Sequence, residues 1–412
     1  MELPINTGDT AWVMISIALV TMMTPALGFF YGGMVRRKNI LSTLNLSFIT
    51  MGLIGIQWVI FGYSLAFGGS LGGIIGNLDY FGFRNVTGAP SDIYASNIPH
   101  LAFAGFQMTF AVITPALITG AFVERVRFKA FIIFALLWAT LVYDPVAHGV
   151  WGNGGIFAGL GALDFAGGTV VHITAGFSAL AFAMAIRPRR DYANTTIQPH
   201  NIPYTVLGAG LLWVGWFGFN GGSALAADGI AVTALVNTNT AAAAAAVTWM
   251  FISWREHKPS VLGIAVGAVV GLVAITPAAG FVTPLSAIVI GVVAVPISYY
   301  CIRLVHQRRL DESLDVWGCH GMAGAWGALA TGIFATTTVN ANGADGLLYG
   351  GVTQFGIQLL TAIVAALYAF GLTFVLAKVL DAVVGLSVSE EEEQMGLDMS
   401  EHGESAYALE FD

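Results

Sequence analysis

Hydrophobic stretches of about twenty residues recur along the whole chain, and short segments with most of the charged residues separate them. A helix of this length crosses the ~30 Å hydrocarbon layer of a membrane. The pattern therefore predicts an all-α polytopic membrane protein. We expect eleven membrane-spanning helices, at Trp12–Met34, Phe48–Phe67, Leu101–Phe122, Ala130–Val150, Gly167–Ile186, Tyr204–Gly222, Ile230–Trp254, Val261–Ala279, Pro284–Leu304, Leu314–Ala335 and Gly350–Leu380.

Composition favours the same class. Of the 412 residues, 56% are hydrophobic and 10% are charged, where soluble domains carry about 25% charged residues. No basic segment precedes the first hydrophobic stretch, so we interpret it as a retained span and not as a cleaved signal peptide. Cys301 and Cys319 form no CxxC pattern, so the sequence predicts neither a disulfide nor a zinc site. We expect no metal, no cofactor and no nucleic-acid partner.

Positive charge lies almost entirely on one side of the predicted membrane. Of the 16 lysine and arginine residues, all except Arg84 follow odd-numbered spans. Cytoplasmic loops carry the excess of basic residues in membrane proteins. We therefore expect an amino terminus outside the cell, a carboxyl terminus in the cytoplasm, and an odd number of spans across the cell membrane.

The chain divides into two parts by composition. Residues 1–386 form the predicted transmembrane domain, and residues 387–412 form an acidic cytoplasmic tail that contributes much of the net charge of −8. A block of like charges is ordinarily solvated and mobile. A docking or regulatory segment is the alternative for this tail.

Two segments of the chain resemble each other. The stretches at 163–181 and 314–332 both begin Leu-Asp, reach a histidine, His172 or His320, and continue with small residues. Five spans separate them, so the second enters the membrane from the opposite side, as in inverted-repeat transporters. We predict two inverted five-helix repeats around a central pore. Each histidine then lies about 10 Å deep, and the pair meets near the membrane midplane.

Small residues surround these two histidines. Gly168 and Gly176 flank His172, and Gly324 follows His320 by one turn. Such residues allow two helices to approach closely. The plain interpretation is a helix interface held by imidazole hydrogen bonds; the functional one is an ion or proton pathway, which intramembrane ionisable groups usually mark.

Several functional classes lack essential sequence features. All four lysines lie at the cytoplasmic ends of spans, which excludes a retinal protein, and the chain has neither a TVGYG-like filter nor an HExxH motif. A bis-histidine haem protein stays open as a redox alternative. A pore is favoured, because neutral imidazole both donates and accepts hydrogen bonds and can pass a proton. Its substrate is then small, hydrogen-bonding and titratable, which ammonium and ammonia satisfy.

Longer motifs resemble a known family. They are "DTAWVMISIALVTMMTPALGFFYGGMVRRKN", "FQMTFAVITPALITGAFVERVRF", "DFAGGTVVHITAG", "GWFGFNGGSA", "DVWGCHGMAG" and "EEEEQMGLDMSEHGESAY". They are similar to the Amt/MEP/Rh ammonium transporters, on the Amt/MEP branch, from about residue 9 to the tail. The resemblance implies a homotrimer of eleven-span protomers, each with its own narrow pore for ammonium, and a trimeric PII signalling protein docking on the cytoplasmic face. Some members resemble ammonium sensors, which is a further alternative.

The resemblance also implies roles for individual residues. The twin histidines of the family fall on His172 and His320, and its external recruitment site falls on Trp151, Ser223 and Phe110. Its phenylalanine gate falls on Phe110 and Phe219, and its buried aspartate near the mouth falls on Asp164. Asp164 also suits a cap at the start of its span.

Asp144, late in the fourth span, matches no family feature. It is either solvated or a source of negative potential near the outer mouth.

Overall fold

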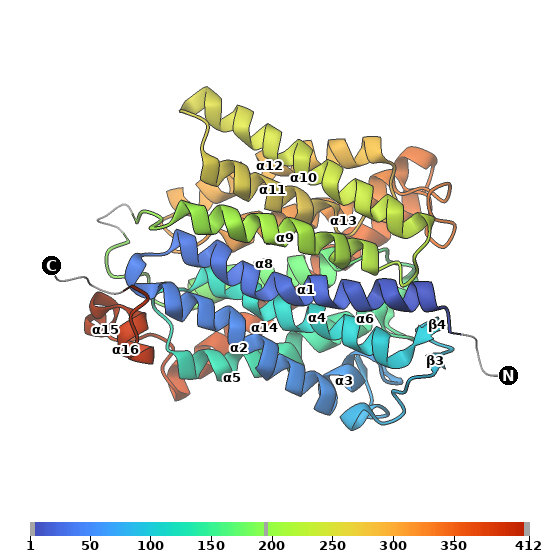
Figure 1. Cartoon of the computed structure of the whole chain (residues 1–412), viewed down its shortest axis with the longest axis horizontal. Helices are drawn as coiled ribbons and strands as arrows, with labels where there is room; N and C mark the ends of the chain where they lie inside the picture. The colour runs from blue at the N-terminus through green and yellow to red at the C-terminus, as the bar shows by residue number, and fades with distance from the viewer. Residues whose placement is uncertain (1–4, 193–196, 408–412) are drawn as a thin grey trace.

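A computed structural model describes residues 5–192 and 197–407 of the chain. Long helices run side by side along the molecule (Figure 1). The α-helices are α1 (Thr7–Met34), α2 (Ile40–Gln57), α3 (Tyr63–Phe67), α4 (His100–Ile118), α5 (Phe128–Trp138), α6 (Asp144–Trp151), α7 (Ile156–Leu160), α8 (Thr174–Ala185), α9 (Ile202–Gly222), α10 (Gly229–Glu256), α11 (Val261–Ile275), α12 (Pro284–Gln307), α13 (Ala323–Phe334), α14 (Val352–Val383), α15 (Glu390–Met395) and α16 (Leu397–His402).

Shorter elements join or interrupt these helices. Four π-helical turns continue neighbouring α-helices: η2 (Trp58–Gly62), η5 (Ala139–Tyr143), η6 (Gly168–Ile173) and η7 (Trp317–Met322). Four are 3₁₀ turns: η1 (Arg37–Asn39), η3 (Phe81–Phe83), η4 (Thr119–Ala121) and η8 (Leu347–Tyr349). Two antiparallel strand pairs join α3 to α4: β1 (Ser70–Leu71) with β2 (Ile75–Gly76), and β3 (Pro90–Ser91) with β4 (Ala95–Pro99).

Each predicted span corresponds to a helix. Within the described ranges, nine helical segments are long and apolar enough to cross a membrane. The other two predicted spans are α11, with 15 residues, and the continuous run of η7 and α13. The all-helical, multi-span architecture is therefore confirmed, and the strand pairs are confined to one connection between helices.

The second helix begins earlier than predicted. We expected Phe48, but α2 begins at Ile40. Polar residues in this first part, such as Ser42 and Thr43, interrupt the hydropathy pattern, but they are only 5% and 1% exposed and therefore face protein and not lipid. The Asn39 side-chain amide donates to Glu124 at 2.9 Å, and the Ser42 backbone N–H donates to Asp398 of the tail at 2.8 Å.

The two histidine-bearing segments fold alike. Each starts with a six-residue π-helical turn that contains the histidine, η6 or η7, and continues as a 12-residue α-helix, α8 or α13. α8 packs on η7, and α13 packs on η6, so the two helices run antiparallel. The two similar sequences therefore also have similar structures.

Glycines permit the close crossing of these helices. A Cβ on Gly176 would meet the backbone of Gly321, and one on Gly324 would lie 3.0 Å from the Cβ of His172. The predicted role of Gly176 and Gly324 in helix approach is therefore confirmed.

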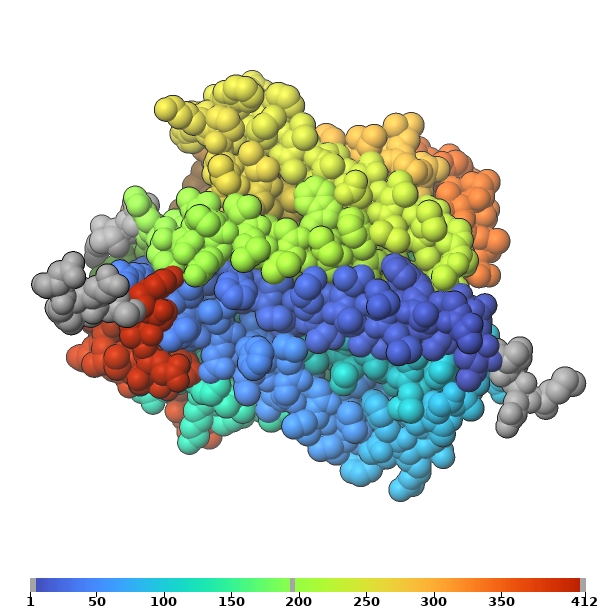
Figure 2. Space-filling model, in the orientation of Figure 1, coloured from blue at the N-terminus to red at the C-terminus, as the bar shows by residue number. Residues whose placement is uncertain are grey.

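The acidic tail is folded onto the bundle. α15 and α16 lie at one end of the molecule, the tail end, and β3 and β4 lie at the other, the strand end (Figure 1). Figure 2 shows these red tail helices against the blue amino-terminal third of the chain. Lys38 Nζ donates to the carbonyls of Glu393 and Gln394 at 2.9 and 2.6 Å. The expectation of a solvated, mobile tail is wrong for its described part, because basic side chains and helix ends bind it.

Candidate functional site

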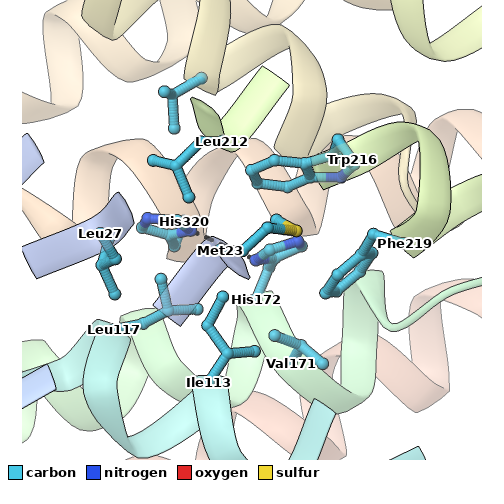
Figure 3. Close-up of a pocket in the computed structure, with 11 residues that line it drawn as sticks. Met23, Leu27, Ile113, Leu117, Val171, His172, Leu212, Trp216, Phe219 and His320 are labelled. Atoms are coloured by element: carbon cyan, nitrogen blue, oxygen red, sulfur yellow. Dashed lines mark hydrogen bonds between the residues drawn. The ribbon is translucent and has the colours of Figure 1, made fainter. Parts of the chain in front are cut away.

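His172 and His320 meet inside the bundle. Their Nδ1 atoms are 3.2 Å apart, and the rings are nearly parallel, with centroids 5.3 Å apart. The side chains are 1% and 3% exposed. Figure 3 shows the two imidazoles joined edge to edge beneath Trp216, with apolar side chains around them. The predicted contact between two deep imidazoles is present.

An aromatic column leads from this pair toward the strand end. Phe219 lies 5.9 Å from the His172 ring, and Phe110 lies 4.3 Å from Phe219, measured between centroids. The next ring is Trp151, 6.0 Å from Phe110 and perpendicular to it. Phe110 and Phe219 are buried, whereas Trp151 is half-buried. The three predicted aromatic residues therefore form one continuous column of ring contacts that ends at His172.

Ser223 follows Phe219 by one turn at the end of α9. Its hydroxyl donates to the Phe219 carbonyl at 2.9 Å, and the residue is half-buried. One turn of helix places i and i+4 side chains on one face. Ser223 is therefore on the Phe219 face of α9, on the side of the strand end.

Asp164 caps the helix that carries His172. Its two carboxylate oxygens accept four backbone N–H bonds, from Gly167, Gly168, Thr169 and Val170, at 2.6–3.0 Å. The Asp164 carbonyl also accepts from the Trp151 indole at 2.9 Å. The predicted capping role is confirmed. Asp164 thus holds both the histidine helix and the outermost ring of the aromatic column.

Asp144 is not solvated. It is 0% exposed, and its Oδ2 accepts from Gln57 Nε2 at 2.8 Å. Gln57 and Asp144 border the π-helical turns η2 and η5, so the pair links two irregular helices. The solvated alternative for Asp144 is excluded.

Sequence reasoning missed Trp216. This indole stacks on His172, with centroids 5.5 Å apart, and donates to Thr276 Oγ1 at 2.8 Å. Trp216 and Phe219 are three residues apart on α9 and so share a helical face. That spacing is the available signal, but among 10 tryptophans it does not single out one residue.

Two cavities meet at His320. A small one, of about 10 Å³, is lined by both imidazoles, Trp216, Phe219 and apolar side chains (Figure 3). A cavity of ~10–15 Å³ holds about one water molecule. A much larger one of about 750 Å³, the vestibule, opens at the tail end and also includes His320 in its wall. The small cavity and the 3.2 Å separation of the Nδ1 atoms leave no room for a porphyrin with an iron between the rings.

The His172 Nε2 atom is available to a guest in the small cavity. It is buried and has no hydrogen-bond partner among the described residues. A small molecule that both donates and accepts hydrogen bonds can therefore bind this nitrogen. Phenyl and leucine side chains around it offer no other polar atom, and so a hydrated ion finds no replacement for its water.

Charged residues at the tail end form a buried network. Glu124 binds Arg36 at 3.0 Å and Arg189 at 2.9 Å, and Asp311 binds Arg189 at 2.7 Å. Burial alone would raise the pKa of Glu124, but Arg189 and Arg36 together hold it at about 2. The network joins loops from both halves of the chain and holds Arg189, which lines the vestibule.

Comparisons with known proteins agree with one another. The family model described as Ammonium Transporter Family matches residues 11–407. The chain is 50% identical to ammonium transporter Amt1 of Archaeoglobus fulgidus, over 97% of this chain and 99% of the relative. It is 49% identical to the ammonium transporter of Bacillus subtilis, over 97% and 98% of the two chains.

Solved structures show the same architecture. Saccharomyces cerevisiae Mep2 superposes with a TM-score of 0.88 at 37% identity, covering 94% of this chain and 89% of the other. A protein described as a sensor Amt protein superposes with a TM-score of 0.87 at 30% identity, covering 96% and 98%.

Proposed function

Because the chain belongs to the ammonium transporter family, and is a multi-pass membrane transport protein for ammonium and not an enzyme, we propose the following mechanism for it. Ammonium is recruited at Trp151, Ser223 and Phe110, gives its proton to His172 Nε2 as it enters the gate, and crosses as ammonia past Phe110 and Phe219. The proton crosses separately through His172 and His320. The observation that carries this proposal is the contact between two buried imidazoles that joins a one-molecule cavity to an open vestibule.

Recruitment relies on replacing lost hydration. Dehydrating a cation is costly, and an aromatic face returns ~0.5–2 kcal/mol through cation–π attraction. The half-buried Trp151 offers such a face at the end of the column. The Ser223 hydroxyl oxygen accepts an N–H bond, which ammonium donates and potassium does not. Asp164 acts by holding the Trp151 indole and the His172 helix in place.

The gate makes deprotonation favourable. Phe110 and Phe219 are buried and in contact, so a species passing between them gives up its water. A full charge in such surroundings is strongly disfavoured, whereas neutral ammonia is not. The His172 Nε2 atom beyond the gate then accepts or donates the hydrogen bond that ammonia needs.

The imidazole pair relays the proton by exchanging tautomers. His172 starts with its proton on Nδ1, which donates to His320 Nδ1, and His320 carries its proton on Nε2. A proton arriving at His172 Nε2 releases the Nδ1 proton to His320, whose Nε2 proton then leaves into the vestibule. Each imidazole is neutral before and after the transfer. The 3.2 Å contact supports this route.

We further propose the topology of the protomer and its assembly. Eleven helices span the cell membrane as two inverted five-helix repeats and a final helix, with residues 1–386 as the transmembrane domain and 387–412 as the cytoplasmic tail. The strand end faces outward and the tail end faces the cytoplasm, because the basic residues that bind the tail lie there. Three protomers form a homotrimer, and a PII-type protein docks on the cytoplasmic face.

The recruitment step has a direct test. In proteoliposomes, Trp151→Leu and Ser223→Ala should raise the ammonium concentration for half-maximal flux, by about tenfold for a loss near 1.4 kcal/mol, with little change in maximal flux. Trp254→Leu is the matched control, since Trp254 is an exposed indole on α10. If Trp151→Leu and Trp254→Leu gave the same half-maximal concentration, the recruitment site would be wrong.

A further inference from the structure

We propose that Glu312 is the proton acceptor on the inner side of the pore, taking the proton from His320 through vestibule water and passing it to the cytoplasm. This inference rests on the proton relay proposed above. It assigns a role to a residue that belongs neither to the histidine pair nor to the recruitment site. Four observations lead to it.

The first observation is the shared cavity. His320 and Glu312 both line the vestibule of about 750 Å³ at the tail end. A space of this size holds many water molecules, and hydrogen-bonded water conducts protons between groups that do not touch. A proton leaving His320 on this side therefore reaches Glu312 without crossing protein.

The second observation is that Glu312 has no cationic partner in the described ranges, while its neighbours do. Asp311, the preceding residue, binds both Arg125 and Arg189. Asp315 binds His306 Nε2 at 2.7 Å. Glu312 enters no ion pair among the described residues, although it is only 3% exposed. It is thus the vestibule carboxyl that is free to exchange a proton.

The third observation is how Glu312 is held. One of its oxygens, Oε1, accepts from the backbone N–H of Trp317 at 2.9 Å. Trp317 begins η7, the turn that carries His320. Asp164 has the same relation to η6 and His172. The sequence similarity pairs Asp164 with Asp315, but the structure gives the capping task on the second helix to Glu312.

The fourth observation is the acidity that its surroundings give Glu312. Burial, with the nearby charge of Asp315, raises the pKa of its carboxyl to about 8. A proton-transfer group works best when its pKa lies near the working pH. The titratable and charged groups that line the same vestibule are Tyr31, Arg189, Tyr192, Glu256, His257, Tyr299, Arg303, His306, Asp315, Cys319 and His320.

This proton transfer needs no reactant besides water. The Nε2 proton of His320 passes to vestibule water as that water releases another proton to the ionised Glu312 carboxylate. The carboxylic acid then releases its proton to cytoplasmic water. Because the pKa of Glu312 is raised, the acceptor is occupied below about pH 8 and vacant above it. Inward proton-coupled current should therefore increase as the internal pH rises through that value.

Glu312→Gln tests the proposal with little structural change. The amide oxygen still accepts from Trp317, but the side chain no longer titrates. We expect ammonium-evoked current on solid-supported membranes to fall by about tenfold or more, because a positioned acid–base group contributes ~10²–10⁴ and water replaces part of it. The current should also lose its dependence on internal pH. Glu312→Asp restores a titratable group and should restore the current and its pH dependence, but with a lower pH midpoint, because an aspartic acid is the stronger acid.

Glu256→Gln is the matched control. It makes the same substitution in the same vestibule, but Glu256 is exposed and bound to Arg303 at 2.6 Å. Its current and internal-pH profile should equal those of the unaltered protein. Equal currents and pH profiles for Glu312→Gln and Glu256→Gln would overturn the role of Glu312. If Glu312→Gln does not fold, an unchanged pH midpoint in Glu312→Asp overturns it instead.

Failure of this inference and failure of the relay give different results. If Glu312→Gln is unaffected while His172→Ala loses its current, the relay stands and the proton leaves by another route. If His172→Ala keeps its current, the relay itself is wrong.

Discussion

An imidazole inside a membrane can relay a proton only when its second nitrogen also has a hydrogen-bond partner. In this protein the two Nδ1 atoms bind each other, His172 Nε2 has no partner among the described residues, and His320 also lines the vestibule. The sequence sufficed to find this pair, since only two of the eight histidines lie far from the ends of predicted spans. It did not suffice for Trp216 or Glu312. A tryptophan or a loop carboxylate becomes a pore residue only through packing between helices distant in the chain.

The phenylalanine gate belongs to this residue scale. Phe219→Ala should leave a folded protein that admits water and hydrated cations, because the ring of Phe219 fills the space between Phe110 and His172. Loss of a buried phenyl group typically costs about 3–5 kcal/mol. Water permeability and potassium leak of proteoliposomes are the measurements.

Phe182→Ala is the control for the gate. Phe182 is 0% exposed and packs on Phe122 and Phe134 away from the small cavity. Both variants should lose similar stability, but only Phe219→Ala should leak. Equal permeability in the two would make Phe219 an ordinary packing residue.

At the scale of elements, hydropathy located every long helix of the bundle, but neither the irregular turns within them nor the short helices of the tail. Spans are visible in the sequence because lipid selects apolar side chains over about twenty residues. The start of α2 was placed too late since its first polar residues, Ser42 and Thr43, are buried against protein. The π-helical turns at both histidines have no hydropathy signature. They arise where helices such as α8 and α13 cross closely, and π-turns are frequent at functional sites.

Because the two histidine helices cross closely, an alanine should lower the stability of the protein at Gly176 and raise it at Gly371, which lies outside the crossing. Gly176→Ala should destabilise the protein by about 1–3 kcal/mol, because its methyl group meets the backbone of Gly321. The exposed Gly371 on α14 has no atom within 4 Å of an added Cβ, so Gly371→Ala should stabilise by about 0.5–1 kcal/mol. Thermal unfolding in detergent measures both. Shifts of the same sign would mean that the crossing is not tightly packed at Gly176.

At the scale of the whole molecule, the two halves are joined by buried charge at the tail end. Arg36, Glu124 and Arg189 come from the first half of the chain, and Asp311 comes from the second. The sequence indicated that basic residues gather on this side. It did not indicate their carboxylate partners, because these pairs form between loops that are far apart along the chain.

The network predicts a dependence of stability on acidity. The pKa of Glu124 is held at about 2, below its ordinary 4.5, so its contribution is present above pH 4.5 and is lost as the pH falls toward 2. Glu124→Gln should cost about 3–5 kcal/mol at neutral pH, since two arginines lose their shared carboxylate. Its unfolding temperature should then fall less steeply between pH 5 and pH 2. Glu390→Gln, at an exposed carboxylate, should keep the original profile; parallel profiles for both variants would contradict the role of Glu124.

In the proposed mechanism, two touching imidazoles carry the proton of ammonium through the protein. Current on a solid-supported membrane after an ammonium jump tests it most directly, in the unaltered protein and in His172→Ala and His320→Ala at matched protein density. His257→Ala, an exposed histidine of the vestibule, serves as the control. We expect current in the unaltered protein and the control, and its loss in both buried-histidine variants. Unchanged current in His172→Ala and His320→Ala would contradict it, and the histidines would then only hold helices together.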